Sequence, residues 1–387
     1  MKEGLRQISG EQIFLTFMPA DLLQFDKARR ARDLVMRFGW NAVSYQILNP
    51  GMRWWFSKRH DAVIGFVLRD GVRVVAGAPI CAENELASVL EEWEKCARKS
   101  GHKICYFAAA GRLHQLLNQK NGCSTVVLGA QPVWGAGDWQ REFESNSSLR
   151  AQISRARNKG VRIEEWPAQK ASGNQELAAI LSQWLHSRGL PSLHFLVEPQ
   201  TLDFLGDRRL FVAVRNEKPV GFLVLAPIAR RQGFLTEQFV RGKGAPNGVI
   251  EWLLFEAISK VEREGAQYLT MGLVPLSLLG GREENPLWLR LILALMRAHG
   301  RRFYNFDGLE TFKSKFHPRS WEPIYAISNQ KEFSPAMLYA VAGAFTRRPV
   351  WLALFLGFRR ALRQETRWLK TKKSAPNSPD GKSRTVK

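Results

Sequence analysis

The sequence predicts an α/β fold in which one run of elements occurs twice along the chain. Two observations carry this prediction. Each half holds short β-rich runs separated by turn residues, and in each half an amphipathic helix, a glycine and a further apolar strand follow. The chain has 387 residues, 45% of them hydrophobic, which is enough for two ordinary cores. We therefore expect two domains, with additional segments.

In the first half we expect a hairpin, a helix and a buried strand, at 61–69, 72–80, 84–99 and 104–109. The hairpin turn falls on Asp70-Gly71, a dipeptide that favours tight two-residue turns. The helix has apolar residues at helical spacing and stops before Gly101.

In the second half we expect a three-stranded meander, a helix and a strand, at 210–215, 220–226, 234–240, 250–261 and 268–273. Gly265 ends this helix as Gly101 ends the first one. The order of meander, helix and strand resembles the core of the acetyltransferase-like (GNAT) fold. We therefore expect two tandem GNAT domains joined by a basic helix.

The expected organisation has five segments: an N-terminal GNAT-like domain at 1–145, a basic linker helix at 146–163, a C-terminal GNAT-like domain at 164–330, a basic amphipathic tail at 331–371 and a disordered end at 372–387. In the tail, the apolar run 350–358 is too short to span a bilayer and has cations on both sides. This pattern is typical of a helix lying in the membrane interface, with Trp351 at the headgroups. The alternative is a helix that docks on a domain.

The charge of the chain indicates a polyanionic partner. Lys and Arg number 57 against 35 Asp and Glu, a formal net charge of +22, which suits nucleic acid or an anionic bilayer. Thirteen Trp and 23 Phe argue against a packaging protein. The four cysteines form no C-x-x-C pair and have no histidine at metal-ligand spacing, so no metal site or disulfide framework is expected. The N-terminus lacks the apolar core of a secretion signal.

The linker helix has a narrow apolar stripe of Leu149, Ile153 and Ala156. Its cations, expected to bind tRNA or phosphate, are Arg150, Arg155, Arg157 and Lys159. Like charges at this density repel one another, so an anionic partner is favoured over a solvated bridging helix, which remains the alternative.

The turn from Arg241 to Gly248 lies between an expected strand and an expected helix, where free backbone N–H groups favour an anion. Arg241 and Gly244 fit the loop of acetyl-CoA transferases, but Pro246 removes one cradling amide, which argues against acetyl-CoA as the donor. The alternative is a plain strand-to-helix turn.

Three motifs stand out: Ala245-Pro246-Asn247-Gly248, Gly272-Leu273-Val274-Pro275-Leu276-Ser277, and the block from Arg302 to Pro323. Together they resemble the catalytic domain of the lysyl-phosphatidylglycerol synthase (multiple peptide resistance factor) family, over roughly 41–328. The chain departs from the family pattern at Glu310, where arginine is common, and at Ser320, which looks inserted.

The resemblance implies an aminoacyltransferase that esterifies an amino acid onto a membrane lipid such as phosphatidylglycerol. Lysine and alanine are the leading candidates for this amino acid. Charged tRNA is then the co-substrate, and no cofactor is expected. The resemblance further implies a stand-alone form, without the flippase domain, that works on the inner face of the cytoplasmic membrane. The alternatives are a tRNA-dependent transferase acting on a peptide or soluble acceptor, an N-acetyltransferase using acetyl-CoA, and a non-enzymatic basic adaptor at the membrane.

An aminoacyl ester is already activated, so such a reaction depends mostly on placement. It needs a carboxylate for the α-ammonium group and N–H or cationic donors for the oxyanion. The expected catalytic residues are Glu237 and Glu251, as ammonium ligand or proton acceptor, and Lys313, as oxyanion donor. The expected substrate-binding residues are Arg241, Asn247, Tyr304, Phe306, Lys315, Trp321 and Glu322. As alternatives, Tyr304 and Phe306 belong to the core, and Glu322 caps local backbone.

Overall fold

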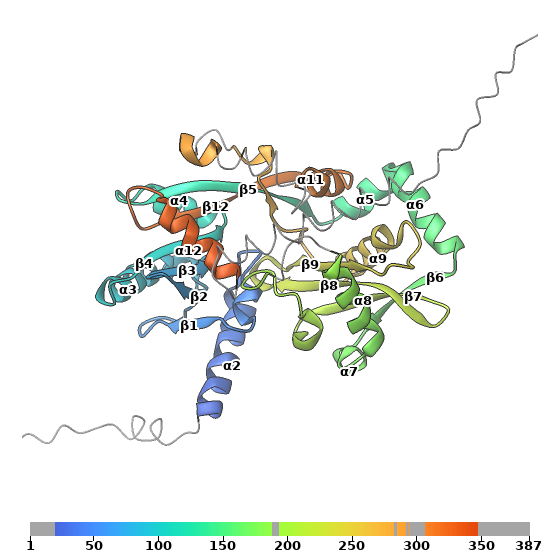
Figure 1. Ribbon diagram of the computed structural model, residues 1–387, viewed down its shortest axis with the longest axis horizontal. Coiled ribbons are helices and arrows are strands. Elements are labelled where there is room, and N and C mark those ends of the chain that lie inside the picture. The colour runs from blue at the N-terminus through green and yellow to red at the C-terminus, as the bar shows by residue number, and fades with distance from the viewer. Residues whose placement is uncertain (1–19, 188–192, 282–284, 292–293, 295–305, 347–387) are drawn as a thin grey trace, which may run out of the picture.

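The structure is a computed structural model that describes residues 20–187, 193–281, 285–291, 294 and 306–346. Figure 1 shows two halves side by side, with helix α2 (Ala20–Phe38) extending from the junction between them. Residues outside the described ranges include Tyr304 and Trp351.

The first half contains the elements η1 (Tyr45–Leu48), β1 (Arg53–Phe56), β2 (Val63–Arg69), β3 (Val72–Ala76), η2 (Glu83–Glu85), α3 (Leu86–Lys99), β4 (Lys103–Ala109), α4 (Gly111–Asn118) and β5 (Ser124–Gly135). The predicted hairpin is confirmed as β2–β3. Its turn residues Asp70 and Gly71 both have positive φ, 48° and 73°, as a tight two-residue hairpin requires.

Two helices, α5 (Asp138–Ser145) and α6 (Ser147–Asn158), connect the halves. The second half contains β6 (Val161–Trp166), α7 (Ala168–Ala171), α8 (Gln175–His186), η3 (Thr201–Phe204), β7 (Arg209–Arg215), β8 (Lys218–Ile228), η4 (Ala229–Arg231), β9 (Gly233–Arg241), α9 (Val249–Arg263), β10 (Tyr268–Thr270), β11 (Val274–Pro275), η5 (Leu278–Gly280), α11 (Phe306–Ser314) and β12 (Ser320–Ser328).

The helices α3 and α9 end in the same way. The N–H of His102 donates to the carbonyl of Ala97, and the N–H of Ala266 donates to the carbonyl of Val261, in each case across a glycine with positive φ. This is the hydrogen-bonding pattern of a glycine-terminated helix. Each helix then leads into a strand that runs parallel to the last meander strand, β4 beside β3 and β10 beside β9. The predicted repeat of two GNAT-like units is confirmed.

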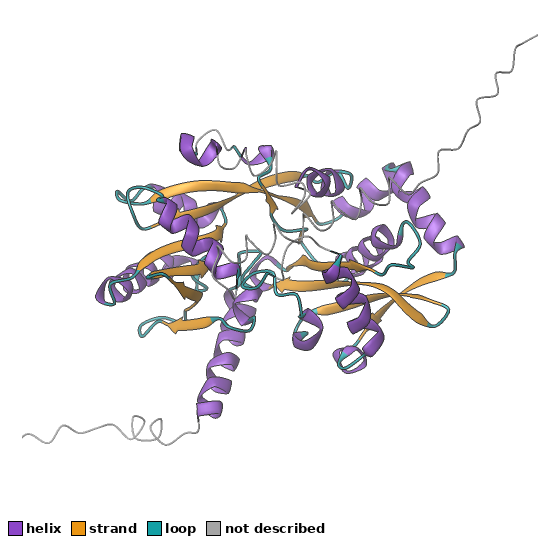
Figure 2. Cartoon of the chain, in the orientation of Figure 1, coloured by secondary structure: helices purple, strands orange, loops and turns teal. Residues whose placement is uncertain are grey.

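One sheet joins the two halves. Within the described residues it has twelve strands in the order β1-β2-β3-β4-β12-β5-β10-β9-β8-β7-β6, with β11 paired to β5. The antiparallel pair β12–β5 lies at its centre, so each half gives its last long strand to the other half. Long strands cross between the halves at the top of Figure 2. The expected domain at 164–330 thus includes a strand that pairs in the first half, and the domain boundaries themselves stay a prediction.

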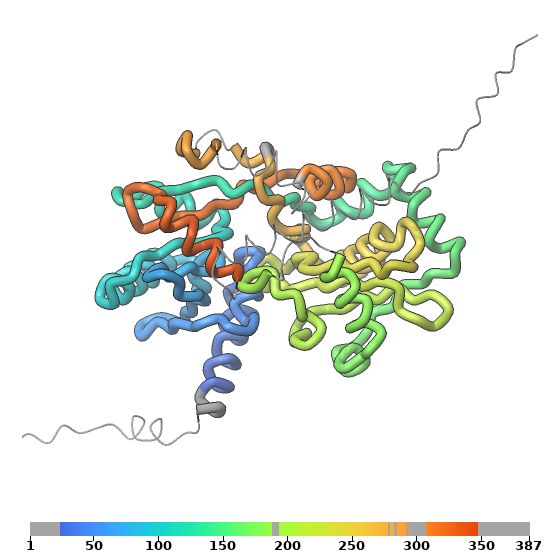
Figure 3. Tube along the Cα trace, viewed as in Figure 1, coloured from blue at the N-terminus to red at the C-terminus, as the bar shows by residue number. Residues whose placement is uncertain are grey.

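Helix α12 (Pro335–Phe345) packs against β2 and β3 of the first half. Figure 3 shows this red segment against the blue strands. Met337 and Val341 are buried, and the Nε of Arg69 donates to the carbonyl of Gly343 at 3.0 Å. This part of the expected tail docks on the first half, as the alternative had it, and the membrane association of the tail stays a prediction. The rest of 331–371 beyond Thr346, and 372–387, lie outside the described residues.

No helix in the described part of the chain is both long enough and apolar enough to span a membrane.

Candidate active site

The strand β9 extends beyond its pairing with β10. They pair only over the three residues of β10, whereas β9 continues to Arg241 with β8 alone as its partner. At this point β9 carries a bulge: Val224 of β8 opposes Gln238, Leu225 opposes Thr236, and Glu237 is the extra residue. A bulge re-aims a side chain and is common beside active sites.

The bulge residue Glu237 forms a buried ion pair with Arg208. The Nε and Nη2 atoms of Arg208 donate to the two carboxylate oxygens at 2.5 and 2.9 Å, and the side chains are 3% and 5% exposed. Burial alone would lower the pKa of Arg208, but Glu237 raises it, so the guanidinium stays charged. Arg208 also donates to the side chain of Asn49 at 2.8 Å, which ties the first half to the second. The charge of Glu237 is thus already compensated. Neither Arg208 nor Asn49 has a local motif that would have pointed to this role.

Lys313, on α11, is buried beside the segment that follows β10. Its Nζ donates to the carbonyls of Met271, Gly272 and Leu273, at 2.5, 2.9 and 3.3 Å, just beyond the end of β10. Burial lowers the pKa of Lys313 to about 7. An ammonium group has three N–H donors, and in this arrangement each one has a carbonyl acceptor. Lys313 therefore fixes the segment that leaves β10.

Lys315, just after α11, forms an ion pair with Glu251 on the first turn of α9. Their side chains are 28% and 12% exposed. The Nζ of Lys315 lies 4.5 Å from the centre of the Phe312 ring and 3.4 Å from the Oε1 of Gln152 on α6. The side-chain amide of Asn146, which caps α6, donates to the carbonyl of Lys315. The structure therefore brings Glu251 and Lys315 together beside the basic helix, whereas Glu237 has a different partner.

The turn before α9 is braced by its own arginine. The Nη2 of Arg241 donates to the carbonyl of Ala245 at 2.7 Å and to the Oδ1 of Asn247 at 2.9 Å. Two of the predicted substrate-binding residues thus bind each other.

The predicted basic helix is α6. Its stripe of Leu149, Ile153 and Ala156 is buried against α9. All four of its predicted phosphate-binding residues are exposed: Arg150, Arg155, Arg157 and Lys159. The guanidinium of Arg157 lies 5.4 Å from the ring centre of Trp252, one residue after Glu251. The cations therefore face solvent next to the Glu251–Lys315 pair.

Glu322 is held where the two halves share strands. It accepts hydrogen bonds from Tyr268 at 2.9 Å, from Gln131 at 3.0 Å and from Arg231 at 2.9 Å. Burial raises the pKa of Glu322, but the bonds from Arg231 and the other donors outweigh it and the pKa is lowered. Glu322 thus joins β12 to β5, β10 and η4 rather than capping local backbone.

Of the other predicted residues, Trp321 is partly exposed on β12 opposite Pro132. Tyr304 and the side chain of Phe306 lie outside the described residues. In the described ranges, no group of three or more His, Cys, Asp or Glu side chains could hold a metal ion.

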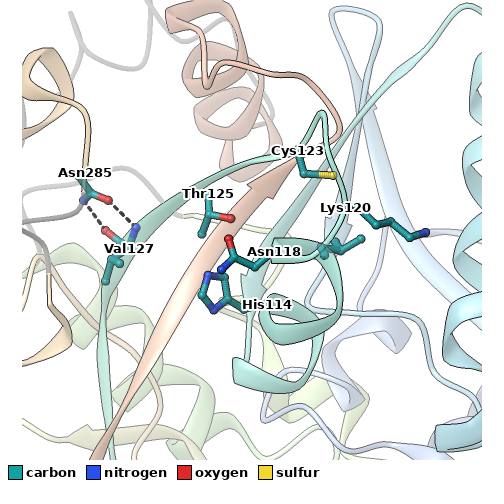
Figure 4. A pocket seen from close by; sticks show the side chains of 8 residues that line it. His114, Asn118, Lys120, Cys123, Thr125, Val127 and Asn285 are labelled. Carbon is teal, nitrogen blue, oxygen red and sulfur yellow. Dashed lines mark hydrogen bonds between the residues drawn. The ribbon is translucent and has the colours of Figure 1, made fainter.

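A cavity of about 250 Å³ lies apart from this group, in the first half beside α4 and β5 (Figure 4). Its lining residues are His114, Leu117, Asn118, Lys120, Cys123, Thr125, Val127 and Asn285. None of the residues predicted from the sequence lines it.

Comparison with known proteins decides the family. Residues 32–328 match the family described as "Phosphatidylglycerol lysyltransferase, C-terminal". The chain belongs to this family. The phosphatidylglycerol lysyltransferase of Staphylococcus xylosus is 21% identical over 305 residues, which cover 78% of this chain and 36% of that protein. The chain thus aligns with little more than a third of the length of this relative.

Two solved structures share the fold. A C-terminal domain from Agrobacterium fabrum, assigned to a lysylphosphatidylglycerol synthetase, superposes with a TM-score of 0.70 at 20% identity and covers 83% of this chain and 98% of that one. The structure of L-PGS from Bacillus licheniformis gives a TM-score of 0.69 at 19% identity and covers 86% and 97%. The resemblance that the sequence motifs predicted is confirmed.

Proposed function

We propose that this chain transfers an aminoacyl group, lysine or alanine, from a charged tRNA to a hydroxyl of a membrane lipid such as phosphatidylglycerol. The observation that carries the proposal is the position of the Glu251–Lys315 pair, beside the exposed cations of α6, in a chain whose family match spans 32–328. The cations would take the tRNA backbone, and the ester at the tRNA end would then lie near the pair.

The reaction exchanges one ester for another. The lipid hydroxyl oxygen attacks the ester carbonyl carbon, the bond from that carbon to the ribose oxygen breaks, and the proton of the lipid hydroxyl ends on the ribose oxygen. Because the ester is already activated, holding the two reactants together supplies most of the rate enhancement.

Each charged residue has a separate role in this proposal. Glu251 accepts the proton of the attacking hydroxyl, and Lys315 stabilises the oxyanion that forms on the carbonyl. Lys313 positions the segment after β10, since its three N–H groups are already taken by carbonyls. Glu237 and Arg208 neutralise each other in a buried ion pair.

The direct test is transfer by the purified full chain. Charged tRNA and phosphatidylglycerol vesicles are mixed with the protein, and the lipid extract is analysed by mass spectrometry. We expect an aminoacylated lipid that disappears when the tRNA is digested with RNase beforehand. A product that forms only with acetyl-CoA, or only on a soluble peptide acceptor, would contradict the proposal.

Variants test the assigned pair. Glu251→Gln and Lys315→Met should each lower kcat by about 10²-fold or more, the range for losing an acid–base group or an oxyanion donor. The matched control is Lys260→Met. Lys260 lies farther along α9, and this substitution breaks its ion pair with Glu165 on β6. An equal loss in all three variants would indicate a structural effect.

A further inference from the structure

Asn146 connects the start of α6 to Lys315 through one side chain. Its Oδ1 accepts from the N–H of Leu149 at 3.1 Å, which caps the helix, and its Nδ2 donates to the carbonyl of Lys315 at 3.1 Å. A carboxamide can make both bonds at once, because it has an acceptor oxygen and an NH2 group. An aspartate at this position would cap α6 equally well but would have no N–H for the carbonyl. The amide nitrogen is therefore the atom that ties the helix to Lys315.

Gln152 connects the middle of α6 to the Nζ of the same lysine. Its Oε1 accepts from the Nζ of Lys315 at 3.4 Å, and its Nε2 donates to the hydroxyl of Ser148, one turn earlier on α6, at 3.3 Å. The bond to Ser148 keeps the amide nitrogen on the helix and the amide oxygen toward Lys315. The backbone of Gln152 is placed as well, since its carbonyl oxygen lies so close to Gly248 that a Cβ there would meet it.

The acceptors around Lys315 leave one N–H of its ammonium group. Such a group has three N–H donors, and within the described residues Glu251 and Gln152 are the acceptors that its Nζ contacts. The ring centres of Phe312 and Phe316 lie 4.5 and 5.3 Å from the Nζ, and aromatic faces attract a cation. The acceptors and the rings together set the direction of the remaining N–H, which is the one that can meet an oxyanion.

Asn174 shows what a helix cap without such a link looks like in this chain. Its Oδ1 accepts from the N–H of Leu177 at 3.0 Å and so caps α8, as Asn146 caps α6. In the described part of the chain the Nδ2 of Asn174 has no acceptor, whereas the Nδ2 of Asn146 binds a carbonyl 169 residues away in the sequence. The bond to Lys315 is therefore additional to the capping role of Asn146.

We propose that Asn146 and Gln152 are positioning residues for Lys315. Asn146 holds the backbone of the lysine, and Gln152 directs its remaining N–H toward the reacting carbonyl. This inference rests on the proposed function, in which Lys315 stabilises the oxyanion and the cations of α6 bind tRNA. It gives α6 a second role, because the helix that binds the tRNA also sets the direction of the oxyanion donor.

The test compares variants that keep or lose each bond in the full chain. Asn146→Asp keeps the cap and removes the N–H donor, and Gln152→Leu removes the acceptor. We expect each to lower kcat by about tenfold or more at saturating tRNA, because a small misplacement of a catalytic group is costly. The affinity for tRNA, measured by fluorescence anisotropy, should stay close to that of the wild type in Gln152→Leu. Gln152→Glu keeps an acceptor oxygen and should retain more of the kcat than Gln152→Leu.

The matched controls carry the same changes elsewhere. Asn174→Asp alters the cap of α8, and Gln140→Leu removes an exposed amide of α5 that donates to Glu144. Both should transfer as the wild type does. A loss of kcat in Asn174→Asp equal to that in Asn146→Asp would reduce the role of Asn146 to capping. A loss in Gln152→Leu that appears only as weaker tRNA binding would overturn the positioning role of Gln152.

A second measurement does not depend on turnover. The rate at which acetic anhydride modifies the Nζ of Lys315, followed by mass spectrometry of peptides, reports how tightly this amine is held. We expect several-fold faster modification of Lys315 in Gln152→Leu than in the wild type, with Lys260 as an internal reference that does not change. Equal rates in the two proteins would overturn the inference. Faster modification in a chain that makes no aminoacylated lipid would count against the proposed function alone.

Discussion

Gly248 and Gln152 bring the basic helix into contact with the helix that carries Glu251. Gly248 has φ of 91°, and a Cβ at this position would lie against the carbonyl oxygen of Gln152, closer than real Cβ atoms come. The last residue of the Ala-Pro-Asn-Gly motif is therefore a glycine for two reasons, its backbone conformation and the close approach of α6. The motif sets the distance between the cations of α6 and the Glu251–Lys315 pair.

Gly248→Ala should therefore destabilise the protein by about 2 kcal/mol or more, because it adds both backbone strain and a clash with backbone atoms. The measurement is the free energy of unfolding in denaturant. Gly244→Ala is the matched control, because Gly244 lies in the same turn with open space around its α-carbon and no positive φ. Equal stability of the two variants would mean that α6 moves away from α9 at little cost.

Lys313→Met should change how stability depends on pH. The pKa of Lys313 in the folded protein is about 7, below the ordinary value of 10.5. Between these values the unfolded chain binds more protons, so the stability of the wild type rises with pH. Below pH 7 both states are protonated and the cost of burying the charge is fully present.

The stability of the wild type relative to Lys313→Met should thus grow by about 1.4 kcal/mol per pH unit within this window. Denaturant unfolding of both proteins at neutral and at alkaline pH measures this difference. A constant difference would show that the three carbonyl oxygens keep Lys313 charged in spite of its burial.

The repeated elements could be predicted because local rules determine them. Asp70-Gly71 makes a hairpin turn, and Gly101 and Gly265 end helices, wherever the rest of the chain lies. Lys313 and Lys315 are two residues apart, and residues two apart along a helix point in different directions. The first points to carbonyls and the second to Glu251.

The exchange of β5 and β12 could not be predicted in this way, because it depends on pairing between strands almost 200 residues apart along the chain. The same holds for the partners of the predicted carboxylates. Arg208 is 29 residues from Glu237, and Arg231 is 91 residues from Glu322. The apolar residues of α12 suited both a membrane and a protein core, and only the tertiary structure distinguishes these environments.

Glu322→Gln should destabilise the protein by about 1–3 kcal/mol at neutral pH, because Arg231 loses its charged partner. The pKa of Glu322 is lower in the folded protein than the ordinary value of 4.5. Its stabilising contribution is therefore present above that value and is lost as the pH falls through the folded-state pKa. Wild type and variant should converge in acid, as measured by unfolding at several pH values. Glu332→Gln, at an exposed position, is the control and should show no such convergence.

Arg155→Glu combined with Arg157→Glu should weaken the binding of tRNA while leaving the fold intact, since both side chains lie off the buried stripe of α6. Phosphate contacts release counterions, so the affinity of the wild type should fall steeply as salt is added, and the variant should show a shallower dependence, by about one to two units of the logarithmic slope. Fluorescence anisotropy with labelled tRNA over a range of salt concentrations measures both quantities.

The charge-matched control, Arg98→Glu with Lys99→Glu, changes two exposed cations at the end of α3 and should bind as the wild type does. Equal affinity and equal salt dependence in all three proteins would mean that α6 is only a bridge between the halves and that the tRNA must be bound elsewhere.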